Sequence, residues 1–232
     1  VSGADATESG TQSVTITIND NEATPTITLT VSATSIAENA GSSLTLTATS
    51  SIVSSANITV SLGTSGTATE GTDYGSVSDI TISAGATTGT TTFTPTDDSM
   101  YETSTDETAT IAIDSVSGGS GAENGTQSVT ITINENESAP TVTLAVSATS
   151  IAENAGSSLT LTATLSGTTS QDVTVSLSSS SSATEGTDYG TVSDITITSG
   201  STTGTASFTP TDDSLYDAAS NETAIIAISG VS

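Results

Sequence analysis

Acidic side chains in this sequence are gathered into short segments whose spacing favours the binding of a divalent cation. Asp97-Asp98 is followed by Glu102 and then by Asp106-Glu107. Two carboxylates about 4 Å apart repel each other by roughly 4 kcal/mol at an effective dielectric constant near 20. Without a cation such a loop should splay or take up protons. Calcium fits best, because it accepts many oxygen ligands in irregular geometry, whereas magnesium prefers a stricter octahedron with more water.

The rest of the composition removes most other functions. The chain has 232 residues, no Lys, Arg, His or Cys, and a formal net charge of −26. Nucleic-acid and anionic-membrane binding need cationic contacts, so neither is expected. A Ser–His–Asp triad, a cysteine nucleophile and a Cys/His zinc site are impossible, and we expect no enzyme activity. Such an acidic surface suits a salty, calcium-rich exterior, although an acidic surface without a special role would look the same.

The sequence repeats itself with a period of 115 residues. Ser32 to Thr49 recurs unchanged as Ser147 to Thr164, and Gly10 to Asn19 recurs as Gly125 to Asn134. We therefore expect residues 1–24 to be the final strand and linker of a preceding repeat. Residues 25–138 form a complete repeat, and residues 139–232 form a second repeat without its last strand. No transmembrane run or signal peptide is visible, as expected for a window on a longer array.

Apolar residues alternate with Ser and Thr in short segments, which is the period of a half-buried β-strand. Seven such segments occur in the complete repeat, separated by turns rich in Gly, Ser, Asn and Asp. They centre on Leu29, Leu46, Val60, Ile80, Phe93, Ile111 and Ile131. The sequence thus predicts an all-β fold of tandem immunoglobulin-like antiparallel β-sandwiches with about seven strands each. We expect Tyr74 and Tyr189 to lie in the cores, and Glu70, Asp79 and Asp114 to lie on solvated faces.

Four segments follow one another in a distinctive order, namely Glu38-Asn39-Ala40-Gly41, Gly66 to Tyr74, Asp97 to Glu102, and Asp106-Glu107-Thr108. Together they resemble the Calx-beta domain. The resemblance implies a seven-stranded sandwich with calcium bound among the loops at one end. Carried over by position, it implies ligands at Glu38, Asp73, Asp97, Asp98, the carbonyl of Met100, Glu102 and Glu107. The acidic segment after the last strand adds Glu135, Asn136 or Glu137.

In the second repeat the same positions are Glu153, Asp188, Asp212, Asp213, the carbonyl of Leu215, Asp217 and Glu222. Here Asp217 stands where the first repeat has Glu102, and the closing acidic segment is missing. Asn19-Asp20-Asn21-Glu22 is also similar to the calcium-binding linker of cadherins. This similarity adds Asp20 as a candidate ligand at a junction between repeats.

We expect a calcium-binding structural repeat of an extracellular stalk, fibre or adhesin, with calcium stiffening loops and junctions. Its partners would be neighbouring repeats or identical chains, without nucleic acid or direct membrane insertion. A filament subunit joined by strand donation through residues 11–19 is one alternative. The others are a calcium-sensing regulatory module and a module that binds sugar through calcium.

Overall fold

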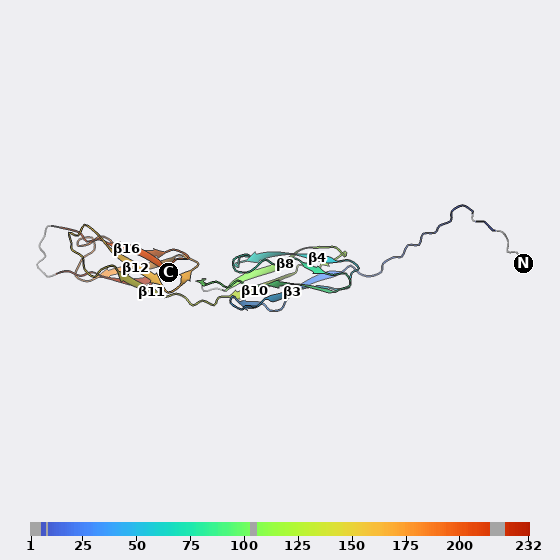
Figure 1. Cartoon of the computed structure of the whole chain (residues 1–232), viewed down its shortest axis with the longest axis horizontal. Coiled ribbons are helices and arrows are strands. Elements are labelled where there is room, and N and C mark those ends of the chain that lie inside the picture. The colour runs from blue at the N-terminus through green and yellow to red at the C-terminus, as the bar shows by residue number, and fades with distance from the viewer. Residues whose placement is uncertain (1–5, 8, 103–105, 214–220) are drawn as a thin grey trace.

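The computed structural model describes residues 6–7, 9–102, 106–213 and 221–232. Two β-sandwiches follow each other along one axis, and an extended segment projects from the far end of the first (Figure 1). The described residues form strands, turns and loops without a helix. Consequently the described part of the chain holds no helix of the length and apolarity that crossing a membrane requires. The all-β tandem sandwich predicted from the sequence is confirmed.

The first sandwich consists of two sheets that face each other across one core. One sheet has the order β6-β3-β1-β9 and the other the order β2-β10-β8-β4-β5. The strands are β1 (Thr26–Val31), β2 (Ser35–Ala37), β3 (Leu44–Ser50), β4 (Ile58–Gly66), β5 (Ile80–Ile82), β6 (Thr88–Phe93), β7 (Met100–Tyr101), β8 (Glu107–Ser117), β9 (Ala122–Glu123) and β10 (Ser128–Asn134). All seven predicted strands are present, and β2, β7 and β9 are short additions to them.

Alternation of side chains explains why these segments form a sandwich. Ile27, Leu46, Val60, Ile111 and Ile131 point into the core and are fully buried, while their Thr and Ser neighbours face outward. The predicted core position of Tyr74 is confirmed, because its ring stacks on Phe93 with centroids 4.7 Å apart. The last strand, β10, pairs with β8 along six residues and with β2 along three. It therefore closes one side of the core.

Asp79 has a structural contact that the sequence did not reveal. A register shift interrupts the pairing of β4 with β8 between Ser61 and Leu62. The exposed Asp79 carboxylate accepts hydrogen bonds from the Ser61 hydroxyl (3.0 Å) and the Leu62 N–H (3.1 Å) at this bulge. Asp194 does the same in the second repeat, accepting from Ser176 and Leu177. The predicted exposure of Asp79 is right, but the side chain also caps an irregular strand.

The second sandwich repeats this arrangement with fewer strands. Its sheets have the orders β11-β12-β16 and β15-β14-β17. The strands are β11 (Val142–Val146), β12 (Leu159–Leu165), β13 (Thr168–Thr169), β14 (Val173–Ser180), β15 (Ile195–Ile197), β16 (Thr203–Phe208) and β17 (Ile225–Val231). β17 corresponds to β8, but among the described residues it pairs only with β14. Nothing in the described chain takes the place that β10 has in the first sandwich.

A short pair of strands connects the two sandwiches. β7 of the first lies parallel to β13 of the second, with Thr168 opposite Met100 and Thr169 opposite Tyr101. The Ser170 N–H donates to the Tyr101 carbonyl (3.0 Å), and the Thr168 hydroxyl donates to the Ser99 carbonyl (3.2 Å). The acidic loop that contains β7 is therefore also the surface on which the next sandwich rests.

Residues 9–24 form no strand in this structure. The side chains of Val14, Ile16 and Ile18 are 89%, 81% and 92% exposed. The assignment of residues 1–24 to a preceding repeat stays a prediction, as do the other boundaries between repeats.

Candidate metal centre

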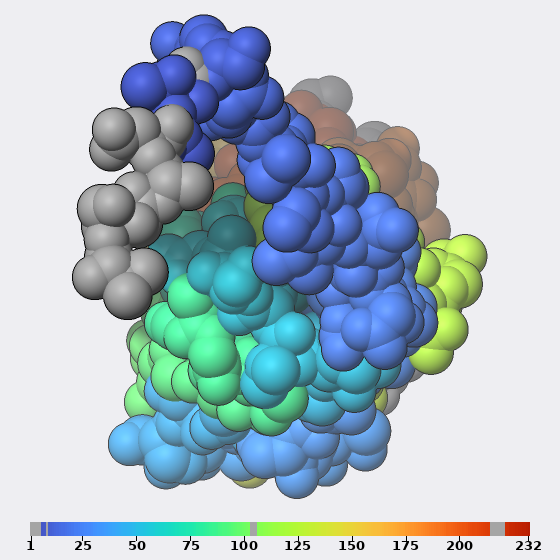
Figure 2. Space-filling view, turned by 90° about the vertical axis from the view of Figure 1, so that its right-hand side faces the viewer, coloured from blue at the N-terminus to red at the C-terminus, as the bar shows by residue number. Residues whose placement is uncertain are grey.

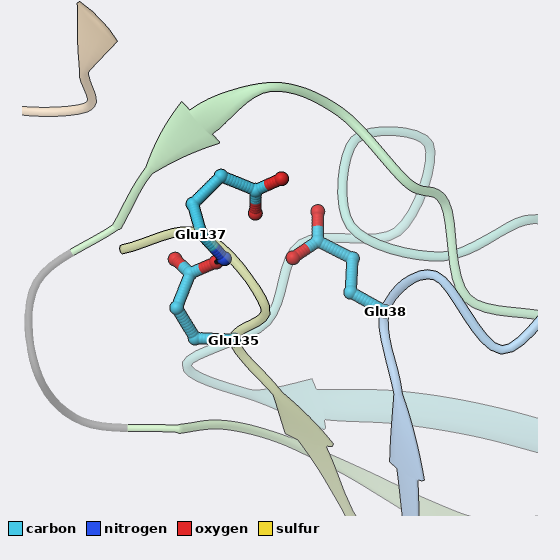
Figure 3. A group of neighbouring side chains, drawn as sticks. All are labelled: Glu38, Glu135 and Glu137. Carbon is cyan, nitrogen blue, oxygen red and sulfur yellow. Dashed lines mark hydrogen bonds between the residues drawn. The ribbon is translucent and has the colours of Figure 1, made fainter. Parts of the chain in front are cut away.

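Three glutamates meet at the end of the first sandwich that faces the second (Figure 3). Glu38 follows β2, while Glu135 and Glu137 follow β10. Each offers a carboxylate oxygen, and these oxygens lie within 4.8 Å of one another. β2 and β10 run parallel side by side, with Ala37 opposite Asn134. This pairing brings the three glutamates together, because each follows the end of one of the two strands.

Backbone donors hold this glutamate triad in place. The carboxylate of Glu135 accepts from the N–H groups of Glu102 (2.7 Å), Asn136 (2.8 Å) and Glu137 (2.9 Å). Glu38 accepts from the Asp98 N–H (3.2 Å). Glu137 accepts from the Asn136 side-chain amide (2.7 Å), but its Oε2 is buried without a hydrogen-bond partner. A buried carboxylate oxygen without a donor is costly, and a cation would satisfy it.

The carboxyl groups of the glutamate triad differ in how readily they ionise. Burial and, to a smaller extent, the charges of Glu135, Asp98 and Glu137 together raise the pKa of Glu38 to about 7, against the hydrogen bond from the Asp98 N–H, which lowers it. When it is protonated, Glu137 can donate to the Glu135 carboxylate, and this raises the pKa of Glu137, as burial and the nearby negative charges do. Burial also acts to raise the pKa of Glu135, but its backbone donors outweigh burial and hold that pKa below its usual range.

A second group of three carboxylates lies beside the first. Asp73, Glu102 and Glu107 also bring carboxylate oxygens within 4.8 Å of one another. Asp73 is held by the Thr69 N–H in the turn before Tyr74, and Glu107 begins β8. Burial and the charge of Asp73 together raise the pKa of Glu107 to about 7 and also raise the pKa of Glu102. In this group, the Asp73 triad, full ionisation of all three carboxyl groups is therefore unfavourable unless a cation balances them.

The two triads are in direct contact through Glu102. The Glu102 N–H donates to Glu135, so one residue belongs to the Asp73 triad by its side chain and to the glutamate triad by its backbone. A cavity of about 10 Å³ is lined by residues of both triads and one apolar side chain, namely Glu38, Asp73, Glu102, Glu107, Glu135 and Ile133. That volume is close to what one water-sized particle occupies. The shape suits a small bound species surrounded by oxygen atoms.

The donor set fits calcium. Oxygen ligands lie about 2.3–2.6 Å from calcium, so ligands on opposite sides of one ion are about 4.6–5.2 Å apart. The carboxylate oxygens of each triad lie within 4.8 Å of one another, which is close enough for one such ion to contact all three. The described residues offer only oxygen donors, and the chain has no cation of its own to balance them. A hard divalent cation is therefore the species that this arrangement can hold.

Six of the predicted ligands belong to the two triads, namely Glu38, Asp73, Glu102, Glu107, Glu135 and Glu137. Asp97 and Asp98 belong to neither triad, and their side chains are exposed. Asp98 donates its N–H to Glu38 and accepts from the Met100 N–H (2.6 Å). Asn136 is exposed and orients Glu137. The roles of Asp97, Asp98, Met100 and Asn136 as ligands stay predictions.

The second repeat reproduces part of this geometry. Glu153 accepts from the Asp213 N–H (3.0 Å), as Glu38 does from Asp98. Asp188 accepts from the Thr184 N–H (2.6 Å), as Asp73 does from Thr69. Glu153, Asp212, Asp213 and Glu222 are exposed. Leu215 and Asp217 lie outside the described residues. No carboxylate triad of this kind occurs among the described residues of this repeat or around the exposed Asp20.

Sequence reasoning missed the contribution of the second sandwich to this end of the first. An open cleft of about 630 Å³ is lined by Asp73, Glu102, Asp106 and Glu107 from the first sandwich and by Ser170 and Gln171 from the second. The sequence does mark the segment of the second sandwich that lines this cleft, because it differs between the two repeats. Residues 167–172 read Gly-Thr-Thr-Ser-Gln-Asp, whereas the matching residues 52–57 read Ile-Val-Ser-Ser-Ala-Asn.

One protein family matches this chain along most of its length. The Calx-beta domain matches residues 20–137 and again residues 135–230. The crystal structure of CBD12 from CALX1.2 is 17% identical, with a TM-score of 0.38 over 83% of this chain and 76% of that one. The calcium binding domain CBD12 of CALX1.1 is also 17% identical, with a TM-score of 0.37 over 77% of this chain and 73% of that one.

A two-domain protein of unknown function from Bacteroides fragilis is 10% identical, with a TM-score of 0.32 over 80% of this chain and 84% of that one. A search of curated proteins gave no match. Calx-beta domains are non-catalytic modules that typically bind calcium. Because the two matches together span nearly all of the described residues, the chain belongs to the Calx-beta family as a tandem pair of its domains.

Proposed function

We propose that this chain is a calcium-binding structural module of an extracellular tandem array, in which calcium stiffens the junction between consecutive sandwiches. The observation that carries the proposal is the buried, unpartnered Oε2 of Glu137 inside a triad of like charges. Such a group is destabilising in isolation and becomes favourable when a divalent cation binds. The surrounding fold positions the carboxylates without supplying anything that could neutralise them.

The position of the triads supports a role at the junction. The loop that supplies Glu102 also carries β7, which pairs with β13 of the second sandwich. Glu135 and Glu137 lie between β10 and β11, in the segment that joins the two sandwiches. An ion bound there would hold the loop and the connecting segment together. The mobility of the second sandwich would then fall, because both of its attachments to the first would be fixed.

The net charge of −26 supports an extracellular location. Abundant salt and calcium outside cells screen the repulsion between such repeats. Head-to-tail sandwiches would then form a stalk, a fibre or the shaft of an adhesin. A calcium-sensing module is the second candidate, because the β7–β13 pair links the acidic loop directly to the next domain.

Calcium titration of two matched variants tests the proposal. Glu38→Gln removes a charge from the glutamate triad, whereas Glu153→Gln makes the same change where the described residues form no triad. Calcium should raise the melting temperature of the first sandwich. Glu38→Gln should weaken calcium binding measured by calorimetry about tenfold or more, since contacts to charged groups contribute roughly 1.5–3 kcal/mol. Glu153→Gln should leave that binding phase unchanged.

An unchanged melting temperature of the first sandwich in millimolar calcium would contradict the proposal that this sandwich binds calcium. Small-angle scattering separates the two candidate roles. A structural junction predicts a narrower distribution of distances between the sandwiches with calcium and the same mean arrangement. A sensor predicts that the mean arrangement itself changes.

A further inference from the structure

A glutamine of the second sandwich lies at the acidic end of the first. Gln171 lines the open cleft of about 630 Å³ together with all three members of the Asp73 triad. The two sandwiches follow one another along one axis, and in Figure 2, which looks onto the opposite end of the first, the second lies behind it. Gln171 therefore faces the triad from the side on which the next sandwich lies.

The Asp73 triad separates the small cavity from this cleft. Asp73, Glu102 and Glu107 line both spaces, with Glu38 and Glu135 completing the cavity. Each member of the triad offers one carboxylate oxygen to the group. Calcium takes about six to eight oxygen ligands, so an ion held by the triad needs further ligands from its surroundings. The cleft is the open side from which a neutral ligand can reach such an ion.

Hydrogen bonds hold the backbone on both sides of Gln171. Its own carbonyl accepts from the hydroxyl of the buried Thr169 (2.8 Å). The preceding Ser170 carbonyl accepts from the Ser199 hydroxyl (2.9 Å), and the following Asp172 carboxylate accepts from the Ser199 N–H (2.8 Å). The Ser170 N–H donates to the acidic loop of the first sandwich. These contacts keep Gln171 at the cleft independently of its side chain.

The side chain of Gln171 is free to take a ligand role. It is exposed, and its amide makes no hydrogen bond within the residues that the structure describes. An amide carries a carbonyl oxygen, which calcium accepts as a ligand, and an NH₂ group, which donates to carboxylates. It can therefore face the triad with or without an ion. A carboxylate at this position would add to the repulsion when no ion is bound.

We propose that the side-chain oxygen of Gln171 completes the coordination of calcium at the Asp73 triad, directly or through one water molecule. The second sandwich then contributes a ligand to the calcium site of the first. This inference rests on the proposed function and deepens it, because it names the residue through which the next sandwich responds to the ion.

The first repeat shows that glutamine is not needed for the shape of this loop. Ala56 stands at the position that matches Gln171. The Asn57 side chain next to it accepts from the Ala84 N–H (2.9 Å), which is the bond that holds Asp172 in the second repeat. The turn thus forms with alanine as well as with glutamine, and Gln171→Ala is expected to keep the second sandwich folded.

Calcium titration of the full chain by calorimetry tests the inference. Glu107→Gln removes a carboxylate of the Asp73 triad and so identifies the binding phase that belongs to it. Gln171→Ala should weaken that phase about three- to tenfold, as expected for the loss of one polar contact. Gln171→Glu should strengthen it about tenfold, because the added ligand is charged.

Asp172→Asn is the matched control for these variants. It places in the second repeat the residue that the first repeat has at this position, and it removes a charge from the same loop. The Asp172 carboxylate is engaged by Ser199 and does not line the cleft. At about 0.15 M salt, which screens exposed charges, Asp172→Asn should leave the phase unchanged.

Hydrogen exchange distinguishes a ligand from a residue that only shapes the loop. The Ser170 N–H donates to the Tyr101 carbonyl across the junction, whereas the Ser199 N–H donates within the second sandwich. Calcium should slow exchange of the Ser170 amide in the parent chain, and Gln171→Ala should lose most of this effect. The Ser199 amide should exchange at the same rate with and without calcium in both chains.

Equal calcium affinity and equal calcium-dependent protection in the parent chain and in Gln171→Ala would overturn the inference and leave the proposed function standing. An equal loss of affinity in Asp172→Asn and Gln171→Ala would also overturn it, because the loop would then act without a specific ligand. A parent chain that binds no calcium would overturn both proposals, so the two failures are distinguishable.

Discussion

The two sandwiches have nearly the same sequence up to their last strand and differ in how well they are closed. In the first, β10 lies beside β8, and Phe93, Ile111 and Ile131 are fully buried. In the second, Phe208 and Ile226 remain half-exposed at matching positions. Glu38 is 8% exposed, whereas its counterpart Glu153 is exposed. One strand therefore accounts for both the burial of the core and the environment of the acidic site.

This difference teaches that core and site are not independent in this fold. β10 contributes Ile131 and Ile133 to the core and then delivers Glu135 and Glu137 to the glutamate triad. The loops of the second sandwich keep the hydrogen bonds of Glu153 and Asp188. Those loops are thus shaped by their own turns, whereas the completed charge cluster depends on the closing strand.

The largest effect is expected from Ile131→Asp. A carboxylate at this fully buried position would have no partner, and such substitutions cost about 4 kcal/mol or more. The first sandwich should lose its cooperative melting transition in calorimetry, while the second keeps its own. Ile16→Asp places the same residue at the matching position of the exposed segment and should leave the transition of the first sandwich unchanged. Equal effects of the two variants would contradict the role assigned to β10.

A smaller effect is expected from pH in the presence of a chelator. The pKa values of Glu38 and Glu107 are raised to about 7 in the folded chain, from an ordinary value of 4.5. Between these values the folded state holds protons that the unfolded state has released, so the free energy of unfolding falls as pH rises. The melting temperature of the first sandwich should therefore drop between pH 5 and pH 8.

Saturating calcium should reverse that trend, because the ion replaces the protons and binds more tightly to ionised carboxylates. The second sandwich, whose matching Glu153 is exposed, provides the internal reference in the same scan. A chelated first sandwich that gains stability toward pH 8 would be inconsistent with the burial of Glu38.

The smallest effect is expected where β4 and β14 end. Gly66 has φ 131°, and a Cβ there would lie 2.1 Å from the Thr108 carbonyl oxygen. The second repeat has Ser181 at this position with φ 109°, a conformation that costs a non-glycine residue about 1–3 kcal/mol. Ser181→Gly should stabilise the second sandwich by about 1 kcal/mol in urea unfolding, after loss of the hydroxyl contact with Thr223. Gly66→Ser should destabilise the first, and the opposite pair of signs would refute this explanation.

The fold was largely predictable because its signal is local. Alternating residues such as Leu44, Leu46 and Ala48 are sufficient to indicate a strand, and seven such strands indicate a sandwich. The partners of each strand were not predictable in the same way. β2 pairs with β10 across almost a hundred residues, and nothing in the short segment Ser35–Ala37 specifies that contact.

The types of residue at the site were predictable from the sequence, but their division into two triads was less so. The resemblance to the Calx-beta domain named Glu38, and Glu135, Asn136 or Glu137, as ligands, but the spacing of the sequence does not separate them from Asp73 and Glu107. That separation depends on where β2, β8 and β10 end in space. The contribution of Gln171 depends on how the next sandwich is placed, which no single repeat encodes.

Glu135 and Glu137 lie on the only covalent path between β10 and β11, and this position has a mechanical consequence. A pulling force along the chain passes through these residues before it reaches the second sandwich. If they hold an ion together with Glu38, the load is shared with β2 and does not fall on the connecting segment alone. The resistance of the junction to stretching would then depend on the calcium concentration around the chain, so that one junction could be stiff or extensible according to its surroundings.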